Sequence, residues 1–174
     1  MNRRPAALLL LMALAGACGR KGPAPLAPDV GLPELLQAPR ADLPALSALR
    51  GKAVVIDFWA TWCPTCVETL PHMNKLAEKF TGKPVVFLSV TDEDRATVQR
   101  FLLTHPMKPW IGLDADARMI RAFGVEEIPQ TFVLDAYGRV QHKLSPSFLY
   151  ASDIQDALDA EAPAVAASAA RATP

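Results

Sequence analysis

The sequence predicts an α/β fold in which a mixed central β-sheet is flanked by helices on both faces. Three observations lead to this prediction. Short apolar runs rich in β-branched residues, typical of buried strands, alternate with segments of helical periodicity. The turn sequence Asp135-Ala136-Tyr137-Gly138 separates two strand-like segments, as in a hairpin. Hydrophobic residues make up 51% of the 174 positions, close to the globular norm of about 45–50%.

The first predicted strand covers residues 53–59, and a helix is expected from Cys63 to about Phe80. Apolar residues of this helix share one face, and Pro71 inside it is expected to kink it because its ring removes a backbone donor. The remaining elements are a strand at 84–90, a helix at 92–103 that opens with an acidic cluster, a strand at 110–113, a helix at 117–123 closed by Gly124, strands at 130–134 and 139–143, and a helix at 152–160.

The N-terminus predicts a targeting segment. Arg3 and Arg4 precede an uncharged apolar run over residues 6–17, which is typical of a signal peptide at 1–17. The run of about 12 residues is too short to span a bilayer, which needs roughly 20. Leu14-Ala15-Gly16-Ala17-Cys18 resembles the bacterial lipobox, so Cys18 is expected to carry a lipid anchor. The alternative is an ordinary cleaved signal peptide that ends near a cysteine by chance.

Composition divides the rest of the chain into three parts. Residues 18–40 are rich in Pro, Ala and Gly and are expected to form an extended linker behind the anchor. Residues 41–160 contain all the predicted strands and helices and form the predicted domain. Residues 161–174 are Ala-rich, with two prolines, and are expected to be a disordered tail.

Charge and cysteine counts exclude several classes of protein. The chain has 18 basic and 18 acidic side chains, which argues against a nucleic-acid partner. Three cysteines are too few for a disulfide-stapled scaffold, or for a four-cysteine zinc site. We expect no cofactor and no metal.

The segment Trp62-Cys63-Pro64-Thr65-Cys66 indicates redox chemistry. Cys63 falls where a strand gives way to a helix, and the free amides and positive dipole end of a helix N-terminus favour a thiolate. Cys66 lies nearly one turn further on the same face. The pair is therefore expected to form and break a disulfide, with Cys63 attacking the substrate sulfur and Cys66 resolving the mixed disulfide.

The alternative interpretations of the cysteine pair are a metal site and a purely structural disulfide. A metal site would need more ligands, and His72, the histidine nearest in sequence, is expected to point away from the cysteine face. A purely structural disulfide would contribute little stability, because it closes a very short loop.

Residues 56–66, with Pro71 in the following helix, resemble the active-site segment of the thioredoxin superfamily, and most closely its membrane-tethered TlpA/ResA-like branch. The segments Phe123-Gly124-Val125 and Ile128-Pro129-Gln130-Thr131-Phe132 follow that branch in the same order. The resemblance covers about residues 43–160. It implies a thioredoxin fold with an inserted helix after the second core strand, corresponding to residues 92–103.

The resemblance also implies roles for individual residues. Pro129 matches the family's cis-proline opposite the cysteines, and Ile128 would present its backbone to an extended substrate. Asp57 matches a buried acid beneath the second cysteine. Its pKa is expected to be raised so that it exchanges a proton with Cys66. Trp62, Pro64 and Thr65 are expected to contact the substrate, with Trp62 covering the disulfide. In one departure, Thr69 stands where many relatives carry Glu.

The function implied is a periplasmic thiol-disulfide oxidoreductase, bound through Cys18 to the inner or outer membrane. It is expected to act as a monomeric reductant of protein disulfides, fed by a membrane thiol-disulfide electron donor. The resemblance suggests substrates from cytochrome c maturation or copper-site assembly.

The alternative functions are a thiol peroxidase and a copper chaperone. A thiol peroxidase of the peroxiredoxin class would need Pro seven residues before Cys63, where Ile56 stands. A copper chaperone on the same fold would use both cysteines and a distal histidine, His105 or His142, but such relatives space the cysteines one residue wider.

Overall fold

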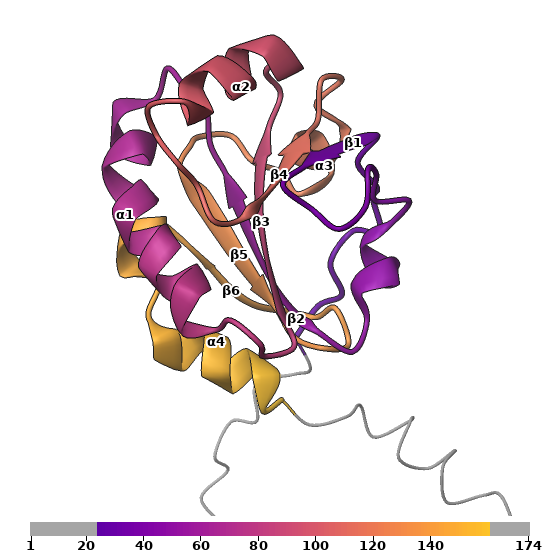
Figure 1. Cartoon of the computed structure of the whole chain (residues 1–174). Coiled ribbons are helices and arrows are strands. Elements are labelled where there is room, and N and C mark those ends of the chain that lie inside the picture. Colours follow the sequence, from indigo (N-terminus) through magenta and orange to yellow (C-terminus); the bar gives the residue numbers. More distant parts are fainter. Residues whose placement is uncertain (1–23, 161–174) are drawn as a thin grey trace, which may run out of the picture.

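The computed structural model describes residues 24–160, and its centre is a six-stranded sheet in the order β1-β4-β3-β2-β5-β6 (Figure 1). The strands are β1 (Glu34–Leu36), β2 (Ala53–Phe58), β3 (Val85–Thr91), β4 (Trp110–Leu113), β5 (Gln130–Leu134) and β6 (Val140–Leu144). The α-helices are α1 (Pro64–Lys79), α2 (Arg95–Leu102), α3 (Arg118–Ala122) and α4 (Ala151–Leu158), and two short 3-10 helices are η1 (Leu46–Leu49) and η2 (Pro146–Phe148).

The sheet is mixed, as the sequence predicts. β2, β3 and β4 are parallel, whereas β5, β6 and β1 join it by antiparallel pairing. Parallel neighbours need a long crossover, and α1 and α2 supply the crossovers on either side of β3. β2 lies between β3 and β5, so its C-terminal end, which leads into the cysteine pair, is held by strands on both sides.

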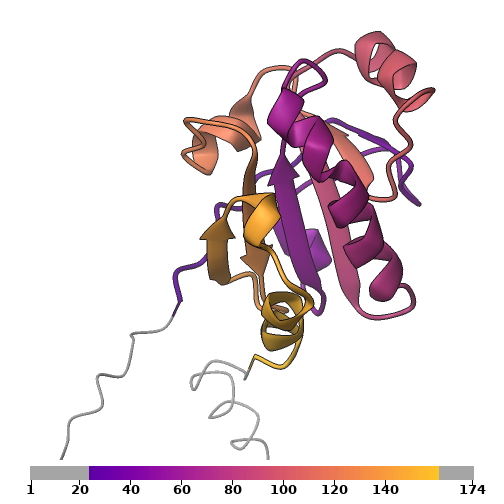
Figure 2. The same ribbon diagram turned by 90° about the vertical axis from the view of Figure 1, so that its left-hand side faces the viewer.

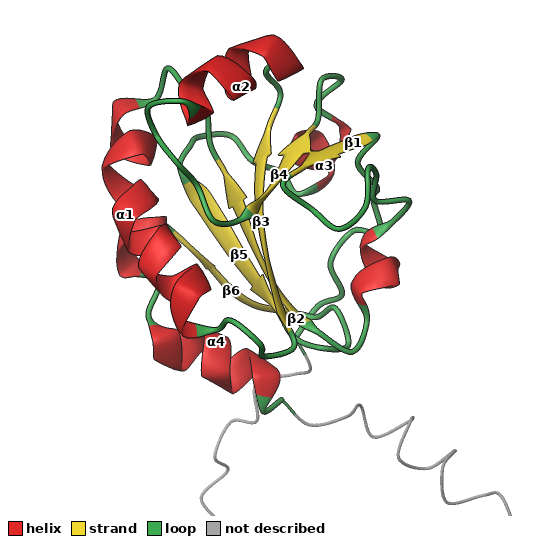
Figure 3. Ribbon diagram, viewed as in Figure 1, coloured by secondary structure: helices red, strands yellow, loops and turns green. Residues whose placement is uncertain are grey.

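Helices cover both faces of the sheet (Figures 1 and 3). On one face, Val55 of β2 packs with residues of α1 and α4, including Met73 and Ile154. On the other face, Ile56 packs with Met119 of α3 and with apolar residues of the N-terminal segment and η1. Because successive strand residues point to opposite faces, Asp57 lies on the face covered by α1, like Val55.

The predicted elements are confirmed, with shifted ends. The strands at 110–113 and 130–134 have the predicted bounds, whereas the helix predicted from residue 92 begins at Arg95. There the Asp94 side chain accepts hydrogen bonds from the Thr97 N–H and hydroxyl, so one residue of the acidic cluster caps the helix. α1 continues through Pro71. The inserted helix after the second core strand is α2.

The prediction that residues 18–40 form a linker is wrong for the part the structure describes. β1 pairs with β4 at the sheet edge, and Leu32 pairs with Leu43. Leu32 and Leu35 are buried in the core. A Cβ at Gly31 would overlap the backbone of Leu43 and Pro44, which shows how closely this segment crosses the chain behind it. The domain therefore begins before residue 41. The high proline content of this segment led to the linker prediction, although its leucines are spaced to pack against the sheet.

Both ends of the described chain leave from the pole of the domain opposite the N-terminus of α1 (Figures 1 and 2). The predicted signal peptide, the Cys18 anchor, the first part of the linker and the tail at 161–174 lie outside the described residues. Within residues 24–160, no helix combines the length and the hydropathy needed to cross a bilayer.

Candidate active site

The cysteine pair lies at the junction predicted from the sequence. β2 ends at Phe58, and Cys63 is the residue that caps α1, with Pro64 in the first helical position. A proline fits there because its missing N–H would have no partner inside the helix. Cys63 and Cys66 are joined by a disulfide with an S–S distance of 2.14 Å.

The first turn of α1 surrounds the sulfur of Cys63 with hydrogen-bond donors. The Cys66 N–H donates to Cys63 Sγ at 3.2 Å, and the Thr65 hydroxyl lies 3.4 Å from the same sulfur. These donors and the positive end of the helix dipole would stabilise negative charge on Sγ after reduction. Cys63 is 4% exposed and Cys66 1%, so Cys63 is the more accessible of two buried sulfurs.

Asp57 is a buried carboxyl beneath α1. It is 3% exposed, and the Thr131 hydroxyl on the neighbouring strand donates to Asp57 Oδ1 at 2.7 Å. Asp57 and Thr131 are direct partners in the β2–β5 register. Burial raises the pKa of Asp57 from its usual 3.8 to about 7, and the hydrogen bond from Thr131 opposes that rise. Such a pKa lets the carboxyl gain and lose a proton near neutral pH.

The loop before β5 contains Pro129, and the Ile128–Pro129 peptide bond is cis. Ile128 packs against the cluster that contains both cysteines. Among the described residues, neither the N–H nor the C=O of Ile128 has a hydrogen-bond partner. The loop therefore offers unpaired backbone groups close to the disulfide.

The two tryptophans before the cysteines have different environments. Trp59 is buried, packs in the cysteine cluster and contacts the Phe101 ring at a centroid distance of 5.3 Å. Its Nε1 has no hydrogen-bond partner among the described residues. Trp62 is 69% exposed. Trp62 and Ile128 both line a hollow of about 390 Å³, so the exposed Trp62 side chain forms part of its wall.

Two residues that the sequence reasoning missed hold this site. Thr131, which was part of the family motif, is the hydrogen-bond partner of Asp57. Glu93, in the acidic cluster after β3, accepts hydrogen bonds from the N–H and hydroxyl of Thr61, each at 2.6 Å. Glu93 thereby fixes the loop that leads to Cys63. From the sequence, the acidic cluster predicts the start of a helix. The contact between Glu93 and Thr61 arises only when the chain is folded.

The histidines lie apart from the cysteine pair. His72 Nε2 donates to the Leu149 carbonyl oxygen at 2.8 Å, and His105 stacks on Phe101. Within residues 24–160, no group of three or more His, Cys, Asp or Glu side chains is arranged to hold a metal ion. Thr69 stands where many relatives carry Glu. Its hydroxyl donates to the Cys66 carbonyl oxygen at 2.8 Å, so this side chain bonds to the backbone of its own helix.

A mixed sheet with flanking helices and a Cys-x-x-Cys disulfide at the start of its first long helix defines a thioredoxin-fold protein. The chain belongs to the AhpC/TSA family, which it matches over residues 26–143. This match begins within the segment that the sequence analysis assigned to the linker, in agreement with the packing of residues 24–40.

Individual relatives agree with this assignment. The chain is 31% identical over 119 residues to thiol-disulfide oxidoreductase ResA of Geobacillus thermodenitrificans, covering 68% of each protein. It is 32% identical over 100 residues to ResA of Bacillus cereus, covering 57% of this chain and only 58% of that protein. In structure it is similar to a thiol:disulfide interchange protein DsbE from Chlorobium tepidum, with a TM-score of 0.68, 28% identity, and coverage of 78% of this chain and 96% of that one.

Proposed function

We propose that this protein is a thiol-disulfide oxidoreductase that exchanges its Cys63–Cys66 disulfide with protein substrates. The observation that carries the proposal is a disulfide at the N-terminus of α1 whose more accessible sulfur accepts a backbone hydrogen bond. The names of the relatives support the same activity.

The exchange takes place in two steps. In the reduced protein, the Cys63 thiolate attacks one sulfur of a substrate disulfide. A bond forms between Cys63 and that sulfur, the substrate disulfide breaks, and the other substrate sulfur leaves as a thiolate. Cys66 then attacks Cys63, which restores the protein disulfide and releases the second substrate thiol. Two electrons pass to the substrate, and the protein dithiol is oxidised.

Asp57 serves the second step. Cys66 must lose its proton to attack, and a buried carboxylate on the α1 face of β2 is the group that would accept it. With a pKa of about 7, Asp57 is partly ionised at neutral pH, so it can take the proton and later return it. Pro129 and Ile128 would position the substrate, and Trp62, Pro64 and Thr65 would contact it.

We also propose the direction and location of the reaction. A thioredoxin-like protein in an oxidising periplasm is useful as a local reductant, which requires a thiol-disulfide electron donor in the membrane. The lipobox-like segment supports anchoring through Cys18 to the inner or outer membrane, with the protein acting as a monomer. Cysteine pairs of apocytochrome c or of a copper-site protein are suitable substrates.

The alternatives are less well supported. The position that a peroxiredoxin fills with proline holds Ile56 in the middle of β2. For a copper chaperone, neither His105, stacked on Phe101, nor His142 in β6 belongs to a ligand cluster with the cysteines.

Trapping tests the activity. The reduced protein should reduce a cystine-containing peptide catalytically with a dithiol as regenerant, and Cys63→Ser should abolish this. Cys66→Ser should stop at the mixed disulfide, detected by mass spectrometry as one peptide bound per protein. In cells, the same variant should capture the physiological substrate. Normal turnover by Cys66→Ser would overturn the assigned roles.

Fractionation tests the anchor. Wild-type protein should sediment with membranes, and Cys18→Ser should release it to the soluble fraction, because no acyl chain would remain. Membrane association of Cys18→Ser equal to that of the wild type would contradict the anchor while leaving the activity untouched.

A further inference from the structure

We infer that the hollow lined by Trp62 and Ile128 selects substrate segments with Lys or Arg next to the cysteine, and that Glu126 and Glu127 carry this selection. The inference rests on the proposed function, since it concerns the substrate of that same site. It commits to one occupant, an extended cationic stretch of a cysteine-containing protein.

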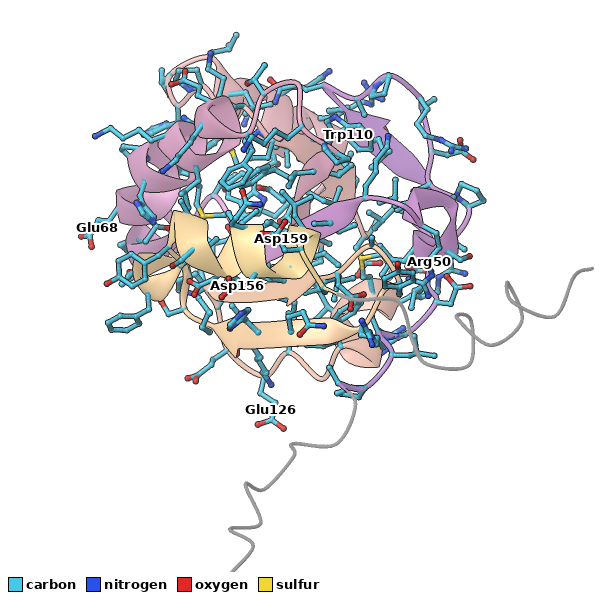
Figure 4. All side chains as sticks on the ribbon, turned by 90° about the horizontal axis from the view of Figure 1, so that it is seen from below. Arg50, Glu68, Trp110, Glu126, Asp156 and Asp159 are labelled. Atoms are coloured by element: carbon cyan, nitrogen blue, oxygen red, sulfur yellow. A yellow bond between two sulfur atoms is a disulfide. The ribbon has the colours of Figure 1, made fainter. Side chains whose placement is uncertain are left out.

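The hollow is apolar inside and acidic at its rim. Its volume is about 390 Å³, and its lining includes Trp62 and Ile128 together with the side chains Asp92, Glu126 and Glu127. The other lining residues are apolar, and none of the lining residues is basic. All three acids are exposed, and Glu126 projects away from the ribbon (Figure 4).

In the described part of the chain, the acidic side chains of the rim are not held in ion pairs. No ion pair between described residues involves Asp92, Glu126 or Glu127. Lys143 lines a second hollow together with Glu126 and Glu127, but it forms no ion pair with either, and its Nζ lies 5.5 Å from the centre of the Phe132 ring. Carboxylates around a low-dielectric hollow concentrate the field and attract a cationic group, which speeds its association.

The side chain of Trp62 also attracts cations. An exposed indole face binds an ammonium or guanidinium group through its quadrupole, with Trp the best of the aromatic residues for this contact. At 69% exposure Trp62 has such a face available next to Cys63. Its loop is held in place because Glu93 accepts both hydrogen bonds from Thr61. The backbone next to Trp62 is therefore held in place before substrate arrives.

The backbone on the other side of the hollow favours an extended peptide over a small cation. In the described structure, the N–H and C=O groups of residues 126–128 have no hydrogen-bond partners. An extended chain could pair with them, as in strand addition, while its cysteine faces Cys63. A Lys or Arg one or two residues from that cysteine would then reach the acidic rim.

Peptide competition provides the test. The probes are symmetric cystine dimers of three peptides that differ only in the residues flanking the cysteine, which are Lys, Gln or Glu. Either sulfur of a symmetric dimer gives the same products, so the attack is unambiguous. Each rate of thiol release by the reduced protein is divided by the rate with free dithiothreitol, which removes the effect of the flanking charge on the disulfide itself.

We expect the normalised rate at low salt to be about tenfold or more higher for the Lys dimer than for the Glu dimer. The preference should shrink steeply as salt is added. The double variant Glu126→Gln/Glu127→Gln should lose most of this preference, because the normalised rate for the Lys dimer falls toward the rate for the Glu dimer. The matched control is Asp156→Asn/Asp159→Asn, which removes one charge from α4 and one from the residue that caps its C-terminus (Figure 4), and it should keep the preference.

The outcomes distinguish a failure of the proposed oxidoreductase function from a failure of the proposed substrate selection. If no dimer is reduced, the proposed function fails. If all dimers are reduced at equal normalised rates, only the selection is overturned. A preference that survives Glu126→Gln/Glu127→Gln would overturn the role of these two residues. A preference lost equally in Asp156→Asn/Asp159→Asn would mean that net charge, and not the rim of the hollow, selects the substrate.

Discussion

The buried carboxyl of Asp57 should make the stability of the oxidised protein fall as pH rises, and Asp57→Asn should abolish that fall. The folded protein holds the pKa of this group near 7, against 3.8 when it is exposed. Below pH 3.8 the carboxyl is protonated in both states and costs nothing. Between pH 3.8 and 7 the unfolded chain loses the proton and the folded chain keeps it, so the free energy of unfolding decreases.

The size of the effect follows from the raised pKa. At about 1.36 kcal/mol for each pH unit, the interval from 3.8 to about 7 corresponds to a loss of about 4 kcal/mol. Between pH 5 and pH 8 the loss should be about 3 kcal/mol. This loss is a large part of the 5–15 kcal/mol by which a typical domain is stable. Because the buried acid costs so much stability, we expect it to have a role in the reaction.

Urea unfolding of the oxidised wild-type protein and of Asp57→Asn at pH 5 and pH 8 measures this loss. The variant keeps an oxygen that can accept from Thr131, and any constant cost of a buried amide cancels between the two pH values. The wild type should lose about 3 kcal/mol more than the variant. Asp156→Asn, at an exposed position of α4, should follow the wild type. Parallel pH profiles for Asp57→Asn and the wild type would refute the reasoning.

Two further predictions concern neighbouring parts of the structure. Thr131→Val removes the hydroxyl that donates to Asp57, so the pKa of the carboxyl should rise further, and the pH dependence of disulfide exchange should move to higher pH; an unchanged midpoint in stopped-flow kinetics would count against the contact. Leu32→Ala should lower the free energy of unfolding by about 2–5 kcal/mol, because this residue is fully buried against the sheet. Leu26→Ala, at an exposed position of the same segment, is its control, and equal effects of the two would contradict the packing of residues 24–40.

Local patterns in the sequence were enough to predict the α/β mixed sheet and the position of the cysteine pair at the start of a helix. The run over residues 53–58, the apolar face of the helix after Cys63 and the turn before Gly138 are each set by neighbours in the chain, and each element formed as predicted. The place of Cys63 at the start of α1 follows from the same patterns, since the strand ends before it and a proline follows it.

Contacts between distant residues were beyond that reasoning. Glu93 bonds to Thr61 across 32 positions, and Leu32 packs against strands that lie far from it in the chain. The proline-rich composition around Leu32 predicted an extended spacer, and the segment is indeed mostly irregular. Composition describes the backbone preferences of a segment, but whether it packs depends on a partner surface, here the edge and face of the sheet near β4.

The two ends of the described domain lie at the pole opposite the N-terminus of α1, which Cys63 caps, and this arrangement has a practical consequence (Figure 2). A fusion partner, an affinity handle or a coupling to a solid support at either end would leave the redox-active pole facing bulk solution. If the chain is held by a lipid, the disulfide would point away from the bilayer, toward partners that approach from the aqueous side.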